Sequence, residues 1–397
     1  MLNNDYLTKL INLEGVKFKD IYIQEDTVRV LITPINPIRL CPYCGQPTFK
    51  LVDIKPKVYR DVDLAGRACY IEIDLRRFEC QECCCTFNES LDFACPYRHY
   101  TKRYEQQVYK CCQETTATYT GLKFGMSDKT AAEIYYKEAK GKQQHLQSLL
   151  PTQVIGIDEI AIHKGHKDFA VVITDLTNKR VIDILKDRKK AALKAYMATC
   201  DEEFKKEIKF VAIDLWAPYR AVVEEMLPKA KAVADRFHVM QNLNQALDCC
   251  RKRAKQESIN QEIWKDTKYI LLKNRENLTE QQEDLLGKIL ELKPALKVYY
   301  KLKESFRSLF NDLNDRQTGR EKLSAWVLNT IRHKATGYYE FVKTLLNWEE
   351  NILNYFDKRV SSGFVEGVNN KIKLIKRKAY NFVNFENFRI KIIDSFS

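Results

Sequence analysis

Apolar and polar residues alternate along two early stretches of the chain, which is the pattern of half-buried β-strands. The first stretch covers about residues 14–34, and the second runs from Val58 to Phe78. From Thr101 to Gln144 the apolar spacing becomes helical, with a break at Phe124-Gly125-Met126-Ser127. The pattern predicts a β-rich unit over residues 1–95 and a short helical unit after it.

A new pattern begins after Pro151. The apolar segments Val154–Ile162, Phe169–Leu176 and Arg180–Leu185 are separated by two turn-like stretches, at residues 163–166 and 177–179, and they predict three successive antiparallel strands.

Helices and strands then alternate, which is typical of a mixed sheet covered by helices. The expected elements are a helix over Lys190–Glu207, a strand over Phe210–Leu215, a helix over Pro218–Leu227, a strand over Ala230–Ala234 and a helix from His238.

Residues 255–355 show helical periodicity only and predict an all-helical insert. The chain closes with a basic helix around Gly363–Arg377 and with the aromatic residues Tyr380, Phe382, Phe385 and Phe388.

Length and composition restrict the possible functions. A chain of 397 residues exceeds one hydrophobic core, and 45% apolar with 30% charged residues is ordinary globular composition. The net charge of +13 favours a polyanionic partner, although charge alone does not separate DNA from RNA or a membrane surface. Without a signal-peptide pattern or a membrane-spanning run, we expect a cytoplasmic, nucleoid-associated protein with no membrane partner.

Cysteine spacing indicates a metal site. In a reducing compartment the 13 cysteines are metal ligands or buried thiols before they are disulfides. Cys41-Pro42-Tyr43-Cys44 and Cys80-Gln81-Glu82-Cys83 have the two-residue spacing with which two turns hold one tetrahedral Zn²⁺. Buried free thiols are the alternative. Cys84 and Cys85 compete for the fourth position, and we choose Cys83 because it keeps the spacing. Four thiolates leave no open coordination position, so this zinc would be structural.

The helical unit resembles a helix-turn-helix. Thr116–Lys123 and Ser127–Lys140 are two helix candidates, and Ser127 is placed to cap the second. In a DNA-reading unit the second helix would enter the major groove, with Asp128, Lys129 and Glu133 exposed. An ordinary helical hairpin would give the same pattern.

Carboxylates occur at two strands that are otherwise apolar. Asp158 lies within Val154–Ile160, and Asp214 ends the strand that contains Val211-Ala212-Ile213. A buried carboxylate needs a cation or a hydrogen-bond network, so two on neighbouring strands suggest a shared cation, unless each reaches solvent at a sheet edge. Glu366 lies on the closing helix and could point at the sheet, with Asn370 and Lys373 alongside. Oxygen ligands suit two Mg²⁺ or Mn²⁺ ions acting on a phosphodiester.

Basic residues gather in three clusters: Lys186–Lys190, Arg251-Lys252-Arg253, and the group from Lys371 to Lys378. The last cluster shares a helix with Glu366, which favours phosphate binding over a merely solvated face. The predicted DNA-binding residues are Lys129, Arg251, Lys371, Lys373, Lys376 and Arg377.

Several blocks, in their order along nearly the whole chain, resemble the ISL-three family of bacterial insertion-sequence transposases. The blocks are Cys41–Gly45, Gly156–Glu159, Ile213–Arg220, Asp235–Val239 and Gly363–Lys373. A departure is Cys83-Cys84-Cys85, where the family has Cys followed by Gly.

The resemblance implies a DDE transposase that cuts and joins double-stranded DNA at transposon ends. It implies a multidomain α+β fold, with a zinc ribbon, a helix-turn-helix and a ribonuclease-H-like mixed sheet core interrupted by a helical insertion. By that similarity Asp158, Asp214 and Glu366 hold the catalytic ions, and His238 supports them, although a satisfied core histidine is an equal alternative.

The expected domains are residues 1–95 (zinc ribbon), 96–148 (helix-turn-helix), 149–254 (first part of the core), 255–355 (helical insertion) and 356–397 (last part of the core). We expect a homodimer or higher homo-oligomer on DNA. The alternatives are a non-catalytic DNA-binding regulator derived from a transposase and a structure-specific nuclease on the same fold.

Overall fold

The computed structural model consists of two compact units, Met1–Gly141 and Lys142–Ser397. The residues that it describes are 4–36, 38–95, 97–146, 151–162, 168–258, 262–311, 315–360, 363–379, 382 and 384–396. The predicted turn at residues 163–166 and Tyr380 lie outside the described residues. Within the described residues, no helix is both long enough and apolar enough to cross a membrane.

The first unit begins with a β-rich part, as predicted. Its elements are α1 (Asn4–Ile11), β1 (Val16–Ile23), β2 (Thr27–Pro34), β3 (Arg39–Leu40), β4 (Pro47–Thr48), β5 (Leu51–Leu64), β6 (Arg67–Glu79) and β7 (Thr86–Asn88). The main sheet has the order β1-β2-β6-β5, with β7 paired to β6, and β3 pairs with β4 separately. Val28, Val30 and Ile32 alternate into the core of this sheet, which is why the sequence alternates there.

Three helices follow: α2 (Lys102–Glu114), α3 (Ala117–Phe124) and α4 (Asp128–Leu146). Gly125 ends α3 with a left-handed φ of 63°, and Ser127 Oγ accepts a 3.0 Å hydrogen bond from the Thr130 N–H, so the predicted cap is confirmed. Asp61 of β5 is fully buried and accepts hydrogen bonds from Thr101 Oγ1 (2.6 Å) and Arg103 Nε (2.7 Å). This buried network attaches the helices to the sheet.

The second unit contains a five-stranded mixed sheet. Its elements are β8 (Val154–Ala161), β9 (Phe169–Asp175), β10 (Arg180–Leu185), α5 (Lys190–Thr199), α6 (Glu202–Glu207), β11 (Phe210–Ile213), α7 (Ala217–Met226), β12 (Lys231–Ala234) and α8 (Arg236–Gln256). The strand order is β10-β9-β8-β11-β12. β8, β9 and β10 are antiparallel, as predicted, and β11 is parallel to both β8 and β12.

Two predicted elements differ from the structure. The single helix expected over Lys190–Glu207 is two helices, because Cys200 and Asp201 have extended backbones (ψ 144° and 145°). The strand expected to reach Leu215 ends at Ile213, and the Trp216 N–H donates to Asp214 O (2.7 Å) in the turn that leads into α7.

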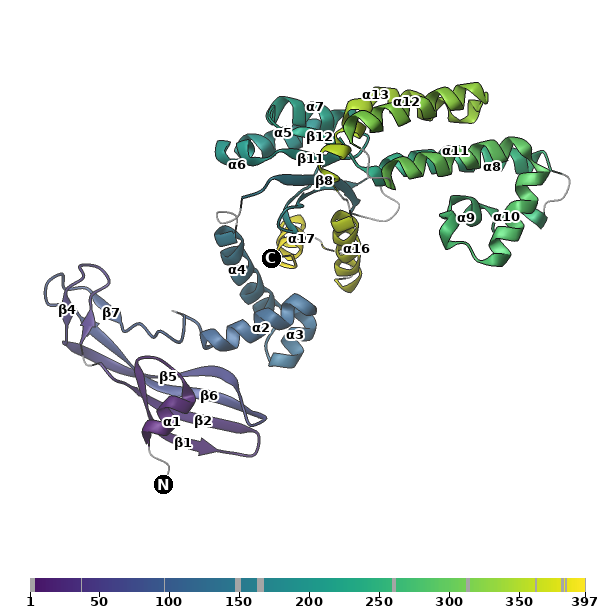
Figure 1. Cartoon of the computed structure of the whole chain (residues 1–397). Coiled ribbons are helices and arrows are strands. Elements are labelled where there is room, and N and C mark those ends of the chain that lie inside the picture. The colour runs from purple at the N-terminus through teal and green to yellow at the C-terminus, as the bar shows by residue number, and fades with distance from the viewer. Residues whose placement is uncertain are drawn as a thin grey trace. The chain divides into compact units, whose positions relative to one another are not determined.

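Helices cover both faces of this sheet (Figure 1). Ile155 and Ile157 of β8 point to the face that packs on α5, α7 and α8. Ile160 points to the opposite face, where it packs on α16 (Gly363–Lys378) and α17 (Phe385–Asp394). Asp158 has the same parity as Ile160 along the strand, so its side chain is on the α16 face.

Residues between α8 and α16 are helical, as predicted. The elements are the 3₁₀ turns at Glu262–Trp264, Arg275–Asn277 and Thr336–Tyr338, with α9 (Thr267–Leu272), α10 (Glu280–Leu292), α11 (Pro294–Asn311), α12 (Arg316–Arg332), α13 (Tyr339–Asn347), α14 (Glu349–Leu353) and α15 (Tyr355–Lys358).

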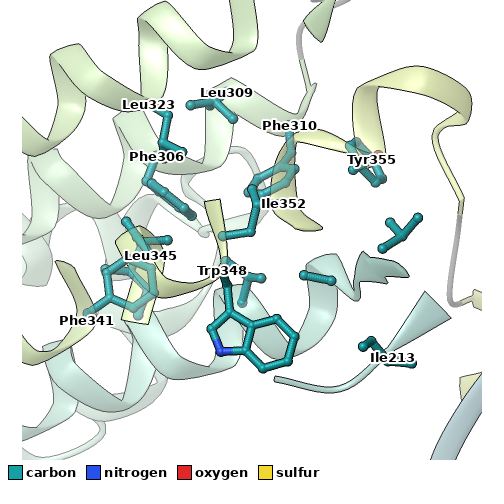
Figure 2. Packing of buried hydrophobic residues seen from close by; sticks show 14 of the residues in the cluster. Ile213, Phe306, Leu309, Phe310, Leu323, Phe341, Leu345, Trp348, Ile352 and Tyr355 are labelled. Atoms are coloured by element: carbon teal, nitrogen blue, oxygen red, sulfur yellow. The ribbon is translucent and has the colours of Figure 1, made fainter. Parts of the chain in front are cut away.

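One hydrophobic cluster runs from the sheet into these helices. Figure 2 shows Phe306 and Phe310 of α11 in the same cluster as Trp348, Ile352 and Ile213 of β11. The ring centroids of Phe306 and Trp326 are 4.9 Å apart, an edge contact typical of aromatic cores. The helical segment is therefore packed onto one end of the sheet by a shared core.

Candidate active site

The zinc-ribbon cysteines come together at the tip of the first unit. The Sγ atoms of Cys41, Cys44, Cys80 and Cys83 all lie within 4.8 Å of one another. Sγ of Cys41 is 3.6 Å from that of Cys83, and Sγ of Cys44 is 3.5 Å from that of Cys80. The backbone N–H of Cys83 lowers the pKa of Cys80 to about 7, while burial and the neighbouring thiols raise the pKa of Cys44 and Cys83, so the support for zinc is the geometry of the four sulfurs.

The two cysteine turns have the same local geometry. The Gly45 N–H donates to Cys41 O (2.9 Å), and the Cys84 N–H donates to Cys80 O (3.0 Å). Both Gly45 (φ 76°) and Cys84 (φ 58°) are left-handed. Cys84 therefore takes the position of the turn glycine, and the structure places Cys83 in the cluster. The donor set and its spacing fit one structural Zn²⁺.

The two predicted strand acids are neighbours in the second unit. Ile157 of β8 pairs in register with Ile213 of β11, so Asp158 and Asp214 come next at the same edge of two parallel strands. Burial raises the pKa of both carboxyls above the ordinary range, and the charge of Asp214 raises that of Asp158 further. Such a pair favours a bound cation.

His238 lies beside these acids at the start of α8. Its Nδ1 is 3.3 Å from Asp235 Oδ2 and 3.6 Å from Asp214 Oδ1. Burial alone would lower the pKa of His238, but Asp235 and Asp214 outweigh it and hold this pKa above its ordinary value. Asp235 also caps α8 by accepting from the Phe237 N–H (2.9 Å), which fixes the histidine near Asp214.

Helix α16 reaches the site through Asn369. Its Nδ2 donates a 2.7 Å hydrogen bond to Asp158 Oδ2. Its Oδ1 is buried and has no hydrogen-bond partner within the described residues. Glu366 is exposed one turn earlier, and among the described residues it forms no ligand group with the two aspartates within 4.8 Å. Asn369 was missed at the sequence level, although its helical spacing of three from Glu366 was visible.

A glycine permits the close approach of α16. A Cβ on Gly156 of β8 would lie 2.6 Å from Thr174 Oγ1 and 3.2 Å from Val365 Cγ2 of α16. Real Cβ contacts are not as short as the one to Thr174 of β9, and the contact to Val365 would push α16 away by a few tenths of an ångström, so glycine lets β8 lie close to both elements. The glycine two residues before Asp158 thereby positions the helix that carries Glu366 and Asn369.

A pocket of about 280 Å³ opens beside the carboxylates. It is lined by Glu159, Arg188, Asp214, Leu215, Trp216, His238, Gln241 and Asn242. Arg188 donates to Glu159 Oε2 (3.0 Å), and its guanidinium lies 5.9 Å from the Trp216 ring centroid. The pocket thus combines acids with a half-exposed cation. Arg188 belongs to the basic cluster Lys186–Lys190, but the sequence did not place it beside the acids.

The predicted basic residues have different environments. Arg251 is 9% exposed and donates from Nε to Asp248 Oδ1 (2.7 Å), so we remove it from the DNA-contacting candidates. Lys376 donates to Ala161 O (2.6 Å), and Lys371 donates to Ser395 O. Lys373 and Arg377 are exposed on α16. Lys129 is exposed on α4, in the first unit.

The oxygen atoms of the carboxylate site are suited to binding a hard divalent ion. Asp158 and Asp214 supply adjacent, partly buried oxygens, and the unpartnered Oδ1 of Asn369 is a further neutral oxygen beside them. Such oxygens are the ligands that Mg²⁺ and Mn²⁺ prefer.

Comparison with known proteins gives the class of the chain. The transposase family profile of the ISL3 type matches residues 155–392, and the profile for the zinc-finger of transposase IS204/IS1001/IS1096/IS1165 matches residues 39–84. These matches cover the sheet with its helices and the cysteine turns, so the class is a transposase with a zinc finger. The chain belongs to the ISL3 (ISL-three) family of transposases.

Individual relatives agree. The transposase for insertion sequence element IS1001 from Bordetella parapertussis is 24% identical over 405 residues, which is 100% of this chain and 99% of the relative. The transposase for insertion sequence element IS1557 from two strains of Mycobacterium tuberculosis is 29% identical over 253 residues, which is 57% of this chain and 56% of the relative.

Proposed function

We propose that this chain is a DDE transposase that binds the terminal inverted repeats of its insertion sequence and catalyses DNA cleavage and strand transfer. The observation that carries the proposal is the pair Asp158, inside β8, and Asp214, directly after β11, which follow the paired residues Ile157 and Ile213 of two neighbouring parallel strands. Burial raises the pKa of both, and no lysine or arginine within the described residues forms an ion pair with either.

The proposed fold of the second unit is ribonuclease-H-like. An antiparallel β10-β9-β8 meander followed by parallel β11 and β12 supports this, as does the position of the two acids in its centre. The spacing of 366 − 214 = 152 residues between Asp214 and Glu366 contains α7 and β12 of the sheet layer and then α8 to α15. We propose the domain limits 1–95, 96–148, 149–254, 255–355 and 356–397, with the fourth as an insertion.

Each group in the site has a proposed role. Two divalent ions, held by Asp158, Asp214 and Glu366, would stabilise the attacking and leaving oxygens of the phosphodiester. Asn369 holds the Asp158 carboxylate in one orientation. His238 Nδ1 is 3.6 Å from Asp214 Oδ1, and from there it would donate a hydrogen bond to that carboxylate or to a phosphate oxygen. Glu366 would have to swing from its exposed rotamer toward the aspartates.

Recognition of DNA is proposed for both units. In the first, α2 to α4 would form a helix-turn-helix with α4 in the major groove, because Asp128, Lys129 and Glu133 are exposed there. In the second, the exposed Lys373 and Arg377 continue the helix of Glu366 and would contact phosphates. Since an element has two ends, we also propose a homodimer or higher homo-oligomer on DNA.

The test uses isosteric substitutions: Asp158→Asn, Asp214→Asn and Glu366→Gln. Supercoiled donor plasmid with the element's ends is scored for 3′-end cleavage and for joined product. We expect each variant to lose cleavage and joining by several orders of magnitude while end-DNA binding survives, and the losses not to add, because the groups act as a unit. Glu340→Gln is the control, because the Glu340 side chain is exposed on α13.

Two results would contradict the proposal. If the parent binds end DNA but neither cuts nor joins it with Mg²⁺ or Mn²⁺, the chain is a non-catalytic regulator. If Glu366→Gln retains full activity, another acid completes the site. Glu349 and Glu350 are poor substitutes, since both pair with Arg320 (3.1 and 2.6 Å).

A further inference from the structure

A groove continues from the carboxylate pocket along α8. A second pocket of about 580 Å³ follows the helix toward α9, and its lining includes Phe237, Met240, Gln241, Asn244, Lys252 and Lys268. Gln241 also lines the pocket that contains Asp214 and His238. The two pockets therefore share a wall, and a ligand that enters at the carboxylates can continue along α8.

An exposed aromatic ring stands where the two pockets meet. Phe237 is 53% exposed, although it lies in the first turn of α8, and its ring centroid is 5.4 Å from that of His238. Met240 follows one helical turn later, on the same side. An aromatic face and a polarizable thioether form a surface on which a planar ring can stack.

The polar groups of the second pocket suit a nucleotide. Gln241 and Asn244 carry amides, which both donate and accept hydrogen bonds. Asn244 lines the pocket, and its Oδ1 is buried without a hydrogen-bond partner in the part of the chain that is described, so a rotation of the amide would let this oxygen accept from an exocyclic amino group. Lys268 and Lys252 lie toward the far end, and the Lys252 ammonium is 3.1 Å from Asp248 Oδ2. Asp248 also lines the pocket and compensates the charge of Lys252, so Lys268 is the lysine that places positive charge where the next phosphate would run.

We propose that this groove holds one unstacked nucleotide of the DNA strand next to the scissile phosphate, with its base on Phe237 and its edge at Asn244. The inference rests on the proposed function, since the phosphate must lie at Asp158 and Asp214. Phe237 is the stacking residue, and Asn244 contributes contacts to the base edge. Every base has a flat face, so we expect the site to tolerate several bases at this position.

The first experiment measures the base directly. Duplex DNA with the element's end carries 2-aminopurine in turn at each nucleotide flanking the cleaved bond, and it is bound in Ca²⁺ so that cutting does not interfere. Binding should change the 2-aminopurine emission severalfold at one flanking position. Phe237→Ala should abolish the change, and Phe237→Trp should retain one. Alanine keeps the cap of α8, because Asp235 accepts from the backbone N–H.

The second experiment measures the chemical consequence. Phe237→Ala should slow cleavage of intact end DNA on the order of tenfold, the range of one base stacked on an aromatic ring. An abasic site at the same position should restore the rate, because no base then has to be unstacked. Tyr339→Ala, an exposed aromatic that lines neither pocket, is the control and should behave as the parent.

A third measurement uses a native thiol in the groove. Cys249 is exposed and lines the second pocket, three turns of helix or roughly 18 Å beyond Phe237. End DNA carries, on a base a few nucleotides from the cleaved bond, a tethered thiol blocked as a mixed disulfide with a small thiol. The Cys249 thiolate should attack this disulfide, release the small thiol and leave a protein–DNA disulfide that does not form with Cys249→Ser.

The outcomes separate the two proposals. A parent chain that cuts end DNA while 2-aminopurine emission stays flat at every flanking position would overturn the nucleotide site alone. So would a Phe237→Ala variant that cuts at the parental rate, or one that changes only the oligomeric state, which would make the groove an interface between protein copies. A parent chain that binds end DNA without cutting it would overturn the proposed function, and the nucleotide site with it.

Discussion

The amide nitrogen of Asn369 donates a 2.7 Å hydrogen bond to Oδ2 of Asp158, and this bond connects helix α16 to the central strand of the sheet. Asn369 lies 211 residues after Asp158. The partner oxygen of the same amide is buried and unpartnered among the described residues. Asn369 therefore both orients a carboxylate and brings a spare oxygen to the proposed metal site.

Asn369→Ala should weaken divalent-ion binding about tenfold or more, because the Asp158 carboxylate loses the donor that orients it. Mn²⁺ binding to the purified chain, followed by electron paramagnetic resonance, measures this without activity. Cleavage of end DNA should fall in parallel and recover partly at high Mn²⁺. Asn370→Ala is the matched control, since Asn370 is the exposed neighbour on α16. Equal effects of the two substitutions would show that Asn369 has no special role.

The strands of the second unit and its two acids could be predicted because the sequence pattern around each of them is sufficient. Strands β8 and β9 are buried on both faces and give continuous apolar segments. Asp158 and Asp214 were recognised because acids are rare in such segments. The left-handed turn that keeps Cys84 out of the cysteine cluster was not visible, but the two-residue spacing still selected Cys83.

The features that could not be predicted depend on how each helix is rotated about its axis and on which residues it packs against. Arg251, Lys252 and Arg253 are consecutive, and periodicity does not say which of them faces Asp248, so the burial of Arg251 was unexpected. The same limit applies to α16. Sequence places Glu366 and Asn369 on neighbouring positions of one face, but which of them contacts Asp158 depends on how Val365 packs over Gly156.

Zinc content should distinguish Cys83, a predicted ligand, from the adjacent Cys84. The purified chain should contain about one zinc, and Cys83→Ser should lose it and unfold the β-rich part of the first unit while the second unit keeps its thermal transition. Cys84→Gly should keep the zinc and gain about 1 kcal/mol, because a left-handed non-glycine residue is relieved of strain. Elemental analysis and calorimetry measure both. Zinc loss from Cys84→Gly rather than from Cys83→Ser would reverse the ligand assignment.

Salt dependence tests the exposed face of α16. Lys373→Ala and Arg377→Ala should each lower the slope of log affinity for end DNA against log salt by about 1, since each removes one phosphate contact. Lys376→Ala should change the slope less, because its ammonium already donates to Ala161 O, and burial lowers its pKa. Lys343→Ala is the control, because the Lys343 side chain is exposed on α13. Unchanged slopes for Lys373 and Arg377 would mean that this face does not meet DNA.

Glu105 of α2 should make the first unit sensitive to pH. It is 3% exposed, and burial raises the pKa of its carboxyl, while Arg98 at 3.6 Å offsets this only partly. The protonated form is therefore favoured in the folded state. Its contribution is fully present below the unfolded pKa and is lost as pH rises through the raised folded pKa.

Glu105→Gln keeps the size of the side chain and removes the titration. We expect the variant to be more stable than the parent by on the order of 1 kcal/mol at pH 8 and to show no advantage at pH 4. Urea unfolding at both pH values measures the difference. Glu133→Gln, exposed on α4, is the control. A parent that is relatively more stable at pH 8 would show that Arg98 outweighs burial.

Gly156 should be intolerant of even one added methyl group. In Gly156→Ala the new Cβ meets Thr174 Oγ1 at 2.6 Å and Val365 Cγ2 at 3.2 Å, so β9 or α16 must move. Overpacking of this kind costs about 1–3 kcal/mol. A displaced α16 also carries Asn369 away from Asp158, so cleavage of end DNA should fall further than stability alone explains, while end-DNA binding survives.

A double-mutant cycle identifies the cause of that loss. Val365→Ala removes the contact on α16, and in the Gly156→Ala/Val365→Ala protein we expect cleavage to recover relative to Gly156→Ala, because the helix can return to the sheet. Gly287→Ala is the matched control: no atom lies within 4 Å of its added Cβ on α10, so it should stabilise the chain by about 0.5–1 kcal/mol. If Gly156→Ala cleaved DNA at the parental rate, the approach of α16 to β8 would not be what positions the site.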